Sequence, residues 1–178
     1  SAHSYHKKTK ILPFDIFKDD KRFQKNKCWR KDCKPVVLIG FGGTYLEKQL
    51  MNRDFADLFS HFCDLVSLSS SKVVYSLHPH DPRNGKLAGA FEKFGWQSIE
   101  RYSRAEPCFV DIVVGATSSF MIESRRKGIP TIEILEFQRS NQLQDGSGTT
   151  ASIMHVTKII KELTESPVTA QEKYLKSI

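Results

Sequence analysis

The sequence predicts an α/β fold: a single Rossmann-like domain with a doubly wound, mostly parallel sheet and helices on both faces. Two observations lead to this prediction. Short runs of β-branched and other apolar residues, typical of strands covered on both faces, alternate along the chain with segments of helical periodicity. The connections between these segments are short, as they are in sheets built from repeated strand–helix units.

The charge of the chain divides it near residue 34. Residues 1–34 contain eleven Lys and Arg against four Asp and Glu, whereas residues 35–178 contain equal numbers of basic and acidic residues. We therefore expect a basic leader or interdomain linker over 1–34 and one Rossmann-like domain over 35–178, to which the candidate nucleotide-binding residues described below belong. Charge runs are usually solvated, and peripheral contact with an acidic membrane surface or with a partner is the alternative for this leader.

The composition excludes several classes of protein and site. No run of about 18 apolar residues is present, so no transmembrane helix is expected, and the leader lacks the apolar stretch of a signal peptide. Four cysteines are too few for a disulfide framework, and Cys28 and Cys33 lie too far apart for a zinc-binding Cys-x-x-Cys pair. We expect a cytoplasmic protein with reduced thiols and without a metal site.

The first strand and helix of the domain are predicted over residues 36–65. Residues 36–41 form a continuous apolar run, as expected of a central strand. Thr44 and Glu47 match the Thr-x-x-Glu capping box, so a helix is expected to begin there. Apolar residues at steps of three and four continue this helix to Leu65, and Asn52-Arg53 is a candidate interruption.

A second strand and a short helix follow. The apolar run over 73–77 predicts a strand, and His78-Pro79 ends it because proline cannot continue a hydrogen-bonded ladder. Residues 85–94 predict a helix that Gly95 closes, since glycine adopts the left-handed cap conformation most easily. Ile99 is the expected centre of a weak edge strand.

The last third of the chain continues the alternation. Residues 111–115 predict a strand, and residues 120–127 predict a helix with a small polar start and Gly128 as its stop. The remaining expected elements are a strand over 131–135, a polar loop over 139–150 and a terminal helix over 151–163.

Candidate binding residues follow the predicted strands, because open α/β sheets bind ligands outside the carboxyl ends of their strands. Gly42, Gly43 and Thr44 place small residues before a helix start, where backbone N–H groups can approach a phosphate. Ordinary turn geometry is the alternative explanation for these two glycines.

The segment after residues 111–115 gives a stronger indication of phosphate binding. Thr117, Ser118 and Ser119 offer three hydroxyls at a helix start, whereas capping requires one. Glu123, one turn further on, is a candidate for hydrogen bonding to a ribose hydroxyl, and an ordinary exposed helix glutamate is the alternative. His78 is the candidate catalytic residue, since its imidazole can donate to a phosphate oxygen or protonate a leaving group near neutral pH.

Together these residues resemble a known enzyme family. The His78-Pro79 pair, followed about forty residues later by the Ser-Ser pair of GATSSFMIESRRKGIP, resembles the second lobe of bacterial capsule and lipooligosaccharide sialyltransferases and polysialyltransferases. These are GT-B glycosyltransferases, which have two Rossmann-like lobes. The similarity covers residue 35 to about residue 165, and its specific content is the two short motifs and their spacing.

The resemblance implies roles for the matching residues. His78 corresponds to a histidine that contacts the nucleotide phosphate and acts as the acid, and Ser118 and Ser119 correspond to a pair that binds the same phosphate. The expected substrates are a nucleotide sugar, either a CMP-linked sialic acid-like donor or a UDP-sugar, and a glycan acceptor. No further cofactor is implied.

One part of the family pattern is missing. These enzymes take their general base from an acid-acid-glycine motif in the first lobe, and here Asp19-Asp20 is followed by Lys21. We therefore expect a donor-binding lobe that needs a first lobe or a partner subunit. Two alternatives are a non-catalytic α/β module that binds an anion or a partner, and a nucleotide-sugar hydrolase or epimerase. Nucleic-acid binding is not expected, because the domain has no net positive charge.

Overall fold

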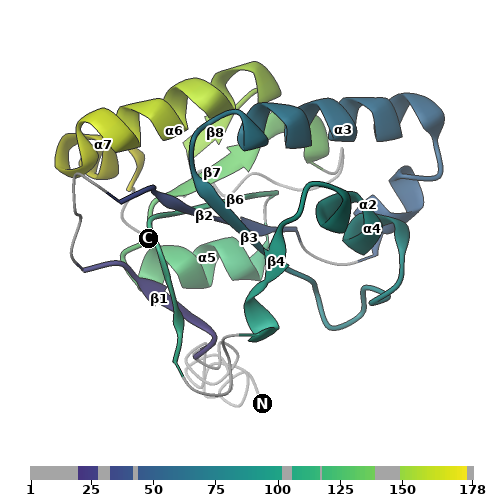
Figure 1. Ribbon diagram of the computed structural model, residues 1–178, viewed down its shortest axis with the longest axis horizontal. Helices are drawn as coiled ribbons and strands as arrows, with labels where there is room; N and C mark the ends of the chain where they lie inside the picture. The colour runs from purple at the N-terminus through teal and green to yellow at the C-terminus, as the bar shows by residue number, and fades with distance from the viewer. Residues whose placement is uncertain are drawn as a thin grey trace, which may run out of the picture.

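The computed structural model describes residues 20–27, 33–41, 44–101, 106–116, 118–138 and 149–175. These residues contain a six-stranded sheet, all parallel, in the order β4-β3-β2-β6-β7-β8 (Figure 1). Its strands are β2 (Val36–Gly40), β3 (Lys72–Ser76), β4 (Gln97–Ser98), β6 (Ile112–Gly115), β7 (Thr131–Ile134) and β8 (Thr149–Ala151). This is the Rossmann order, in which the first and fourth strands of the sheet are neighbours. The predicted fold class is confirmed.

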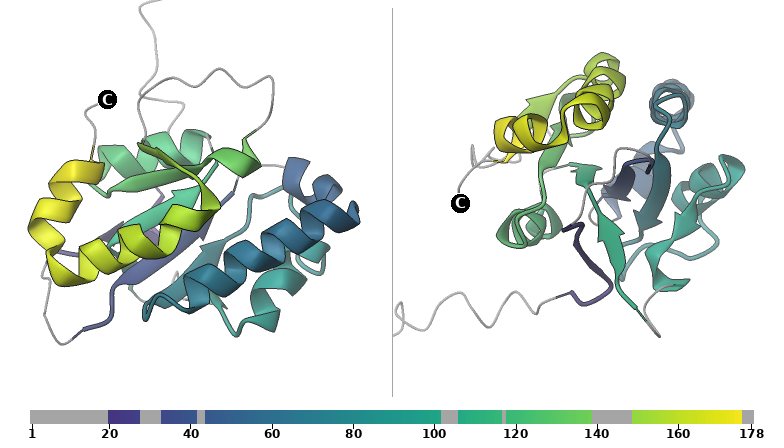
Figure 2. Two further views of the ribbon diagram at one scale, coloured as in Figure 1. Left: turned by 90° about the horizontal axis from the view of Figure 1, so that it is seen from above. Right: turned by 60° about the vertical axis from the view of Figure 1, so that its left-hand side comes forward.

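Helices cover both faces of the sheet. They are α2 (Tyr45–Gln49), α3 (Arg53–Ser67), α4 (Lys86–Lys93), α5 (Ser119–Arg126), α6 (Val156–Glu165) and α7 (Pro167–Tyr174), with short 3₁₀ turns η1 (Ile99–Arg101), η2 (Leu135–Phe137) and η3 (Ile153–His155). Helices α3, α6 and α7 lie above the sheet in Figure 1, and α5 lies below it. Figure 2 shows the same two layers from other directions. None of the described helices is long and apolar enough to cross a membrane.

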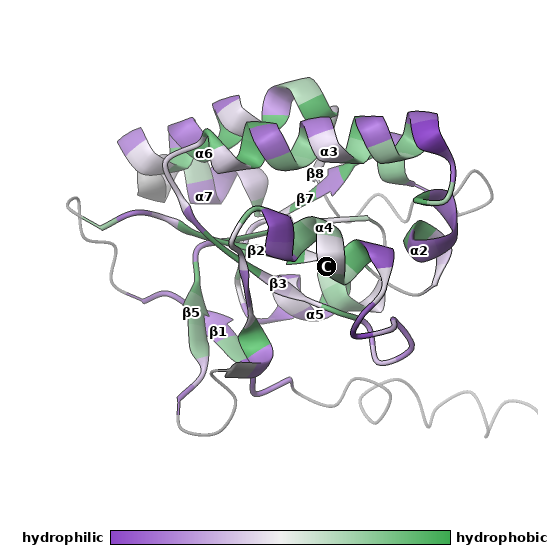
Figure 3. Ribbon diagram, turned by 45° about the vertical axis from the view of Figure 1, so that its right-hand side comes forward, coloured by the Kyte–Doolittle hydropathy of each residue, from purple (hydrophilic) through white to green (hydrophobic). Residues whose placement is uncertain are grey.

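Alternation along the strands divides the core between these two faces. Val37 and Ile39 of β2 pack in the cluster that contains the buried residues of α3, α4 and α6, whereas Leu38 packs with Met121 of α5. Neighbouring residues of a strand point to opposite faces, so Gly40 lies on the α5 face with Leu38. Figure 3 shows hydrophobic colours in the central strands and mixed colours along α3 and α6, as expected of helices with one buried face.

Part of the expected leader belongs to the folded domain. Strand β1 (Phe23–Lys25) pairs in parallel with β5 (Cys108–Val110) on the α5 side, and Phe23 is completely buried. The expected boundary at residue 34 therefore does not hold for residues 20–27. The sequence did not reveal this strand because three residues are too few to show a period, and because its partner lies 85 positions away.

Several local predictions can be compared with the structure. The interruption at Asn52 is confirmed, since α2 ends at Gln49 and the Asn52 side chain caps α3 by accepting from the Phe55 N–H. Gly95 and Gly128 follow α4 and α5 with φ of 73° and 77°, the expected left-handed conformation. Several elements differ from the expected ones. The edge strand β4 ends at Ser98, so that Ile99, its expected centre, lies in η1; β8 begins inside the predicted polar loop, and α6 begins five residues later than the predicted terminal helix. Strand β5 and helix α7 were not predicted.

The capping-box prediction is wrong. Thr44 precedes α2 as its N-cap residue, but its side chain makes no capping hydrogen bond. The Glu47 carboxylate instead accepts from the backbone N–H groups of Lys86 and Leu87, at 2.6 and 2.9 Å, at the start of α4. Glu47 therefore satisfies the free N–H groups of a different helix, a contact between segments 39 residues apart that a local pattern cannot reveal.

Candidate functional site

The carboxyl ends of β3, β2 and β6 form the candidate site. Gly40 at the end of β2 is in register with Ser76 of β3 on one side and with Gly115 of β6 on the other. The chain leaves β2 toward α3 and leaves β6 toward α5 on the opposite face, which makes this the topological switch point of the sheet. With strands spaced about 4.8 Å apart, the ends of β3 and β6 lie about 10 Å apart. The predicted segments around His78 and Ser118 therefore share one edge.

Two glycines allow close packing at this edge. A Cβ atom built on Gly115 would lie 1.9 Å from the carbonyl oxygen of Gly40, and one built on Gly40 would lie 2.2 Å from the Phe120 ring. The Phe120 ring from α5 therefore lies directly on the backbone of β2. The same ring packs against Phe23 of β1, with 5.1 Å between the ring centroids.

A hydrogen-bonded turn fixes His78 after β3. The His78 carbonyl accepts from the Asp81 N–H at 2.9 Å, and the His78 N–H donates to Asp81 Oδ2 at 3.0 Å. The His80 N–H donates to Nδ1 of His78 at 3.1 Å. Because Nδ1 accepts this bond, the proton of the neutral imidazole belongs on Nε2, the position from which it can donate to an anion.

A small cavity lies between the turn, the strand ends and α5. Its volume is about 50 Å³, and Arg22, Ser76, His78 and Phe120 are among the residues that line it. Sequence reasoning selected only His78 from this set. Ser76 precedes His78 by two positions, so the two-residue period of a strand could have placed both on one face. Arg22 gave no signal, because it comes from a segment expected to be a linker.

The N-terminus of α5 forms the other part of the edge. Ser118 is the N-cap residue, and its hydroxyl makes no capping bond. Its Oγ is buried, and within the described ranges it has no hydrogen-bond partner, which is uncommon for a buried polar atom. Ser119 is exposed at the first helical position. Neither serine is among the residues that line the cavity. Gly42, Gly43 and Thr117, predicted to bind phosphate, lie outside the described residues, and Thr44 is exposed.

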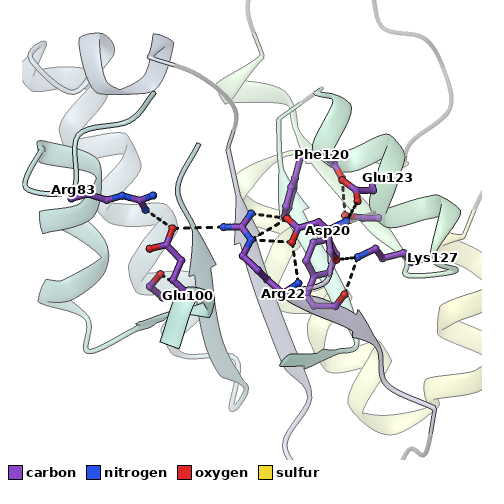
Figure 4. A network of polar contacts seen from close by, with 10 residues as sticks. Asp20, Arg22, Arg83, Glu100, Phe120, Glu123 and Lys127 are labelled. Atoms are coloured by element: carbon purple, nitrogen blue, oxygen red, sulfur yellow. Dashed lines mark hydrogen bonds and ion pairs between the residues drawn. The ribbon is translucent and has the colours of Figure 1, made fainter. Parts of the chain in front are cut away.

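Glu123 contacts the protein's own chain. Its Oε1 accepts from the backbone N–H of Asp20, and Lys127, one turn further along α5, donates to the Asp20 carbonyl (Figure 4). The Asp20 carboxylate in turn accepts from Nε and Nη2 of Arg22, at 2.9 and 2.6 Å. Glu123 thus helps to hold the segment that carries Arg22, and a ribose contact by Glu123 stays a prediction.

Charge in this network shifts two pKa values. Burial raises the pKa of the Asp20 carboxyl, but the hydrogen bonds from Arg22 outweigh that effect and hold the pKa below its usual value. The hydrogen bond to Asp20 raises the pKa of Arg22 in return. Both side chains are therefore ionised at neutral pH.

The Asp81 carboxylate, which closes the His78 turn, gives a test of pH dependence. Asp81 is 3% exposed, its Oδ1 has no hydrogen-bond partner among the described residues, and burial raises the pKa of its carboxyl. An acid with a raised folded-state pKa makes the protein less stable as the pH rises from the ordinary Asp value through the raised one. We expect Asp81→Asn, which keeps an acceptor for the His78 N–H, to be more stable than the parent at pH 7.

Urea unfolding of both proteins between pH 3 and pH 7 measures this difference. The advantage of Asp81→Asn should shrink as the pH falls and disappear near pH 3, where the aspartate is protonated in both states. The exposed Asp57 on α3 provides the control, and Asp57→Asn should change stability by less than about 0.5 kcal/mol at either end of the range. An advantage that grew on acidification would contradict the assignment.

Comparisons with known proteins give little further information. No family model and no curated protein matches the chain. Among solved structures, the spinosyn rhamnosyltransferase SpnG is similar over 78% of this chain, with a TM-score of 0.36 and 18% identity. This chain spans 37% of the length of that one. The identity of the ligand therefore has to come from the chemistry of the site.

Proposed function

We propose that this chain is the donor-nucleotide-binding lobe of a glycosyltransferase, and that it holds the phosphate of a nucleotide sugar at the switch point of its sheet. One observation carries the proposal. The turn that orients the Nε2–H of His78 and the helix start that bears Ser118 and Ser119 lie at the same carboxyl edge, on either side of β2. Rossmann-type sheets bind the phosphates of nucleotides at this position.

The residues at this edge suit the departure of a phosphate. In glycosyl transfer an acceptor hydroxyl displaces the nucleotide from the anomeric carbon, and negative charge develops on the leaving phosphate. The N-terminus of α5 offers its partial positive charge and the Ser118 and Ser119 hydroxyls to that charge. His78 adds a ring N–H donor, which becomes a proton donor when the imidazole is protonated.

The size of the cavity and the acids beside it support a lobe that works with a partner. The cavity of about 50 Å³ is far smaller than the roughly 300–1,000 Å³ of an ordinary small-molecule pocket. Asp20 is bound to Arg22 and Asp81 to the His78 turn, so neither is placed as a base for the acceptor. We propose that a second lobe or subunit closes the cleft, binds the glycan acceptor and supplies that base.

Isothermal titration calorimetry with CMP, UDP and their sugar conjugates tests the proposal. Saturable binding of at least one of these ligands at or below millimolar concentration is the expected result. If none of them binds at millimolar concentration, the proposal fails, because every version of it needs a nucleotide phosphate at this edge.

Substitutions connect binding to the named residues. We expect His78→Ala, and separately the double variant Ser118→Ala/Ser119→Ala, to weaken nucleotide binding by about 1 to 3 kcal/mol, the range for hydrogen bonds to charged groups. His61→Ala, at an exposed position of α3, is the matched control and should bind as the parent does. Unchanged affinity in both site variants, with unchanged melting temperatures, would show that these residues have structural roles only.

A non-catalytic anion-binding module is the second candidate. The observation in its favour is that Asp20 and Asp81, which bind the cavity-lining residues Arg22 and His78, are both engaged within the protein. An assay of nucleotide release from the donor, with and without a glycan acceptor and a candidate first lobe, separates the two candidates. Binding without release under every condition would favour the module.

A further inference from the structure

The cavity beside His78 contains a cationic side chain that the proposed function has not used. Arg22 lines it, and the Arg22 side chain comes from the segment before β1 (Figure 4). One edge of the guanidinium is fixed, because Nε and Nη2 donate to the Asp20 carboxylate. The other edge is not fixed in this way. Nη1 lies 3.7 Å from Glu100, which is within ion-pair range but too long for a hydrogen bond.

Glu100 is more tightly paired with another arginine. Its Oε1 lies 2.5 Å from Nη1 of Arg83, a residue whose side chain is more than half exposed. Arg83 therefore offsets the charge of Glu100, while Asp20 orients Arg22 without using all five of its N–H donors. The N–H groups of Arg22 Nη1 form no hydrogen bond with the described residues and can donate to an incoming anion.

Helix α5 holds Arg22 in place and also provides the predicted phosphate-binding serines. Glu123 accepts from the Asp20 N–H, and Lys127 donates to the carbonyl groups of Asp20 and Phe23. These contacts fix the short segment that presents Arg22. Phe120, a wall of the cavity, directly follows Ser119 in the chain. The cavity and the start of α5 are therefore adjacent parts of one edge.

The chemistry and the size of the cavity match one phosphate group. Its volume of about 50 Å³ is less than twice the roughly 30 Å³ that one water molecule occupies in the liquid, so the cavity has the size of a small polyatomic ion and cannot hold a nucleoside. The polar groups around it are the Arg22 guanidinium, the His78 imidazole and the hydroxyl of Ser76, a residue that is 5% exposed. Arginine N–H groups form short, strong, charge-assisted hydrogen bonds with phosphate, and His78 and Ser76 add further donors beside Arg22.

We propose that this cavity is a second phosphate subsite, that Arg22 is its cationic ligand, and that the site takes a nucleoside diphosphate in preference to a monophosphate. The proposal rests on the proposed function, because the first phosphate is the one placed at Ser118 and Ser119. Arg22 is a binding residue in this arrangement. Asp20, whose hydrogen bonds with described residues go to Arg22 and to α5, is a positioning residue.

Calorimetric titration of the full chain with UMP, UDP, CMP and CDP tests the proposal. The parent protein should bind the diphosphate of a base more tightly than its monophosphate. Arg22→Gln should weaken diphosphate binding about 10- to 100-fold, the factor that corresponds to a lost charge-assisted hydrogen bond, and should leave monophosphate binding nearly unchanged. Lys161→Gln, at a side chain 72% exposed on α6, makes the same change in net charge away from the cavity and should alter either affinity less than about threefold.

Three results would overturn the proposal and leave the proposed function standing. They are equal affinity of the parent for mono- and diphosphate, equal losses for both ligands in Arg22→Gln, and equal losses in Arg22→Gln and Lys161→Gln. If none of the four ligands binds, the proposed function itself is wrong. If Arg22→Gln does not fold, Arg22→Lys is the test. Its single ammonium cannot serve Asp20 and a phosphate together, so the preference for diphosphate should fall about tenfold, and an unchanged preference would overturn the proposal.

Discussion

Glu133→Gln should lower the free energy of unfolding by about 3 to 5 kcal/mol, the usual effect of breaking a buried ion pair. The Glu133 side chain on β7 is 2% exposed and faces the Arg125 guanidinium of α5, which is completely buried. Nη1 of Arg125 lies 3.6 Å from Glu133 Oε1 and donates to Thr131 Oγ1 at 3.0 Å. The variant removes the carboxylate that faces a charge in the low-dielectric interior, where water cannot replace it.

Urea unfolding at pH 7 measures this loss, and the chain offers a matched control. Lys161 and Glu165 form an exposed pair on α6 at 3.8 Å, so Glu165→Gln should cost less than about 0.5 kcal/mol. A loss below about 1 kcal/mol for Glu133→Gln would show that the buried pair does not contribute as the geometry indicates. The double variant Arg125→Met/Glu133→Leu should recover most of the stability, since apolar replacement of a buried pair is often neutral or better.

The double variant also connects stability to the site. Arg125 joins α5 to β7, and the start of the same helix bears Ser118 and Ser119. If the pair serves only to fix α5 against the sheet, the double variant should bind nucleotides as the parent does. If the pair also sets the position of the helix start, nucleotide affinity should fall in the double variant although its stability is restored.

The fold was predictable from the sequence where local pattern and tertiary environment agree. The strands over 36–41, 73–77, 111–115 and 131–135 were recognised because β-branched runs are buried on both faces of the sheet. Gly95 and Gly128 ended their helices as expected, because a left-handed cap is a local requirement. The short strands β1 and β8 were missed, since their residues are ordered by partners distant in sequence and three residues show no period.

For the candidate site, the location could be predicted from the sequence, whereas the contacts made by residues distant in sequence could not. Its location followed from the rule that ligands bind at the carboxyl ends of parallel strands, so His78 and Ser118 could be assigned to one edge from sequence. The position of Arg22 at the cavity could not be predicted, because it depends on the pairing of β1 with β5 and on the hydrogen bond between the Asp20 N–H and Glu123 of α5. The role of Glu47 was misassigned for the same reason, since its partners belong to another helix.

Gly115→Ala should destabilise the protein by about 3 kcal/mol, the upper part of the range for overpacking in a well-packed interior. The new Cβ would lie 1.9 Å from the carbonyl oxygen of Gly40, and this neighbour is backbone that cannot rotate away. Gly89→Ala is the control, because a Cβ there meets nothing within 4 Å in the interior of α4. That variant should stabilise by about 0.5 to 1 kcal/mol, the difference in helix propensity.

Gly115→Ala and Gly40→Ala together separate the contact between strands β2 and β6 from the contact between β2 and the Phe120 ring at the switch point. Relief of the clash at Gly115 requires β2 and β6 to move apart, which would carry the start of α5 away from His78 and weaken nucleotide binding. Gly40→Ala instead meets the Phe120 ring, a side chain that can turn aside, so it should cost less stability and alter mainly the cavity. Urea unfolding and calorimetric titration with nucleotides, applied to both variants, test whether Gly115→Ala has the larger effect on stability and on binding. Equal effects of the two on stability and on binding would show that the spacing of β2 and β6 does not set the geometry of the site.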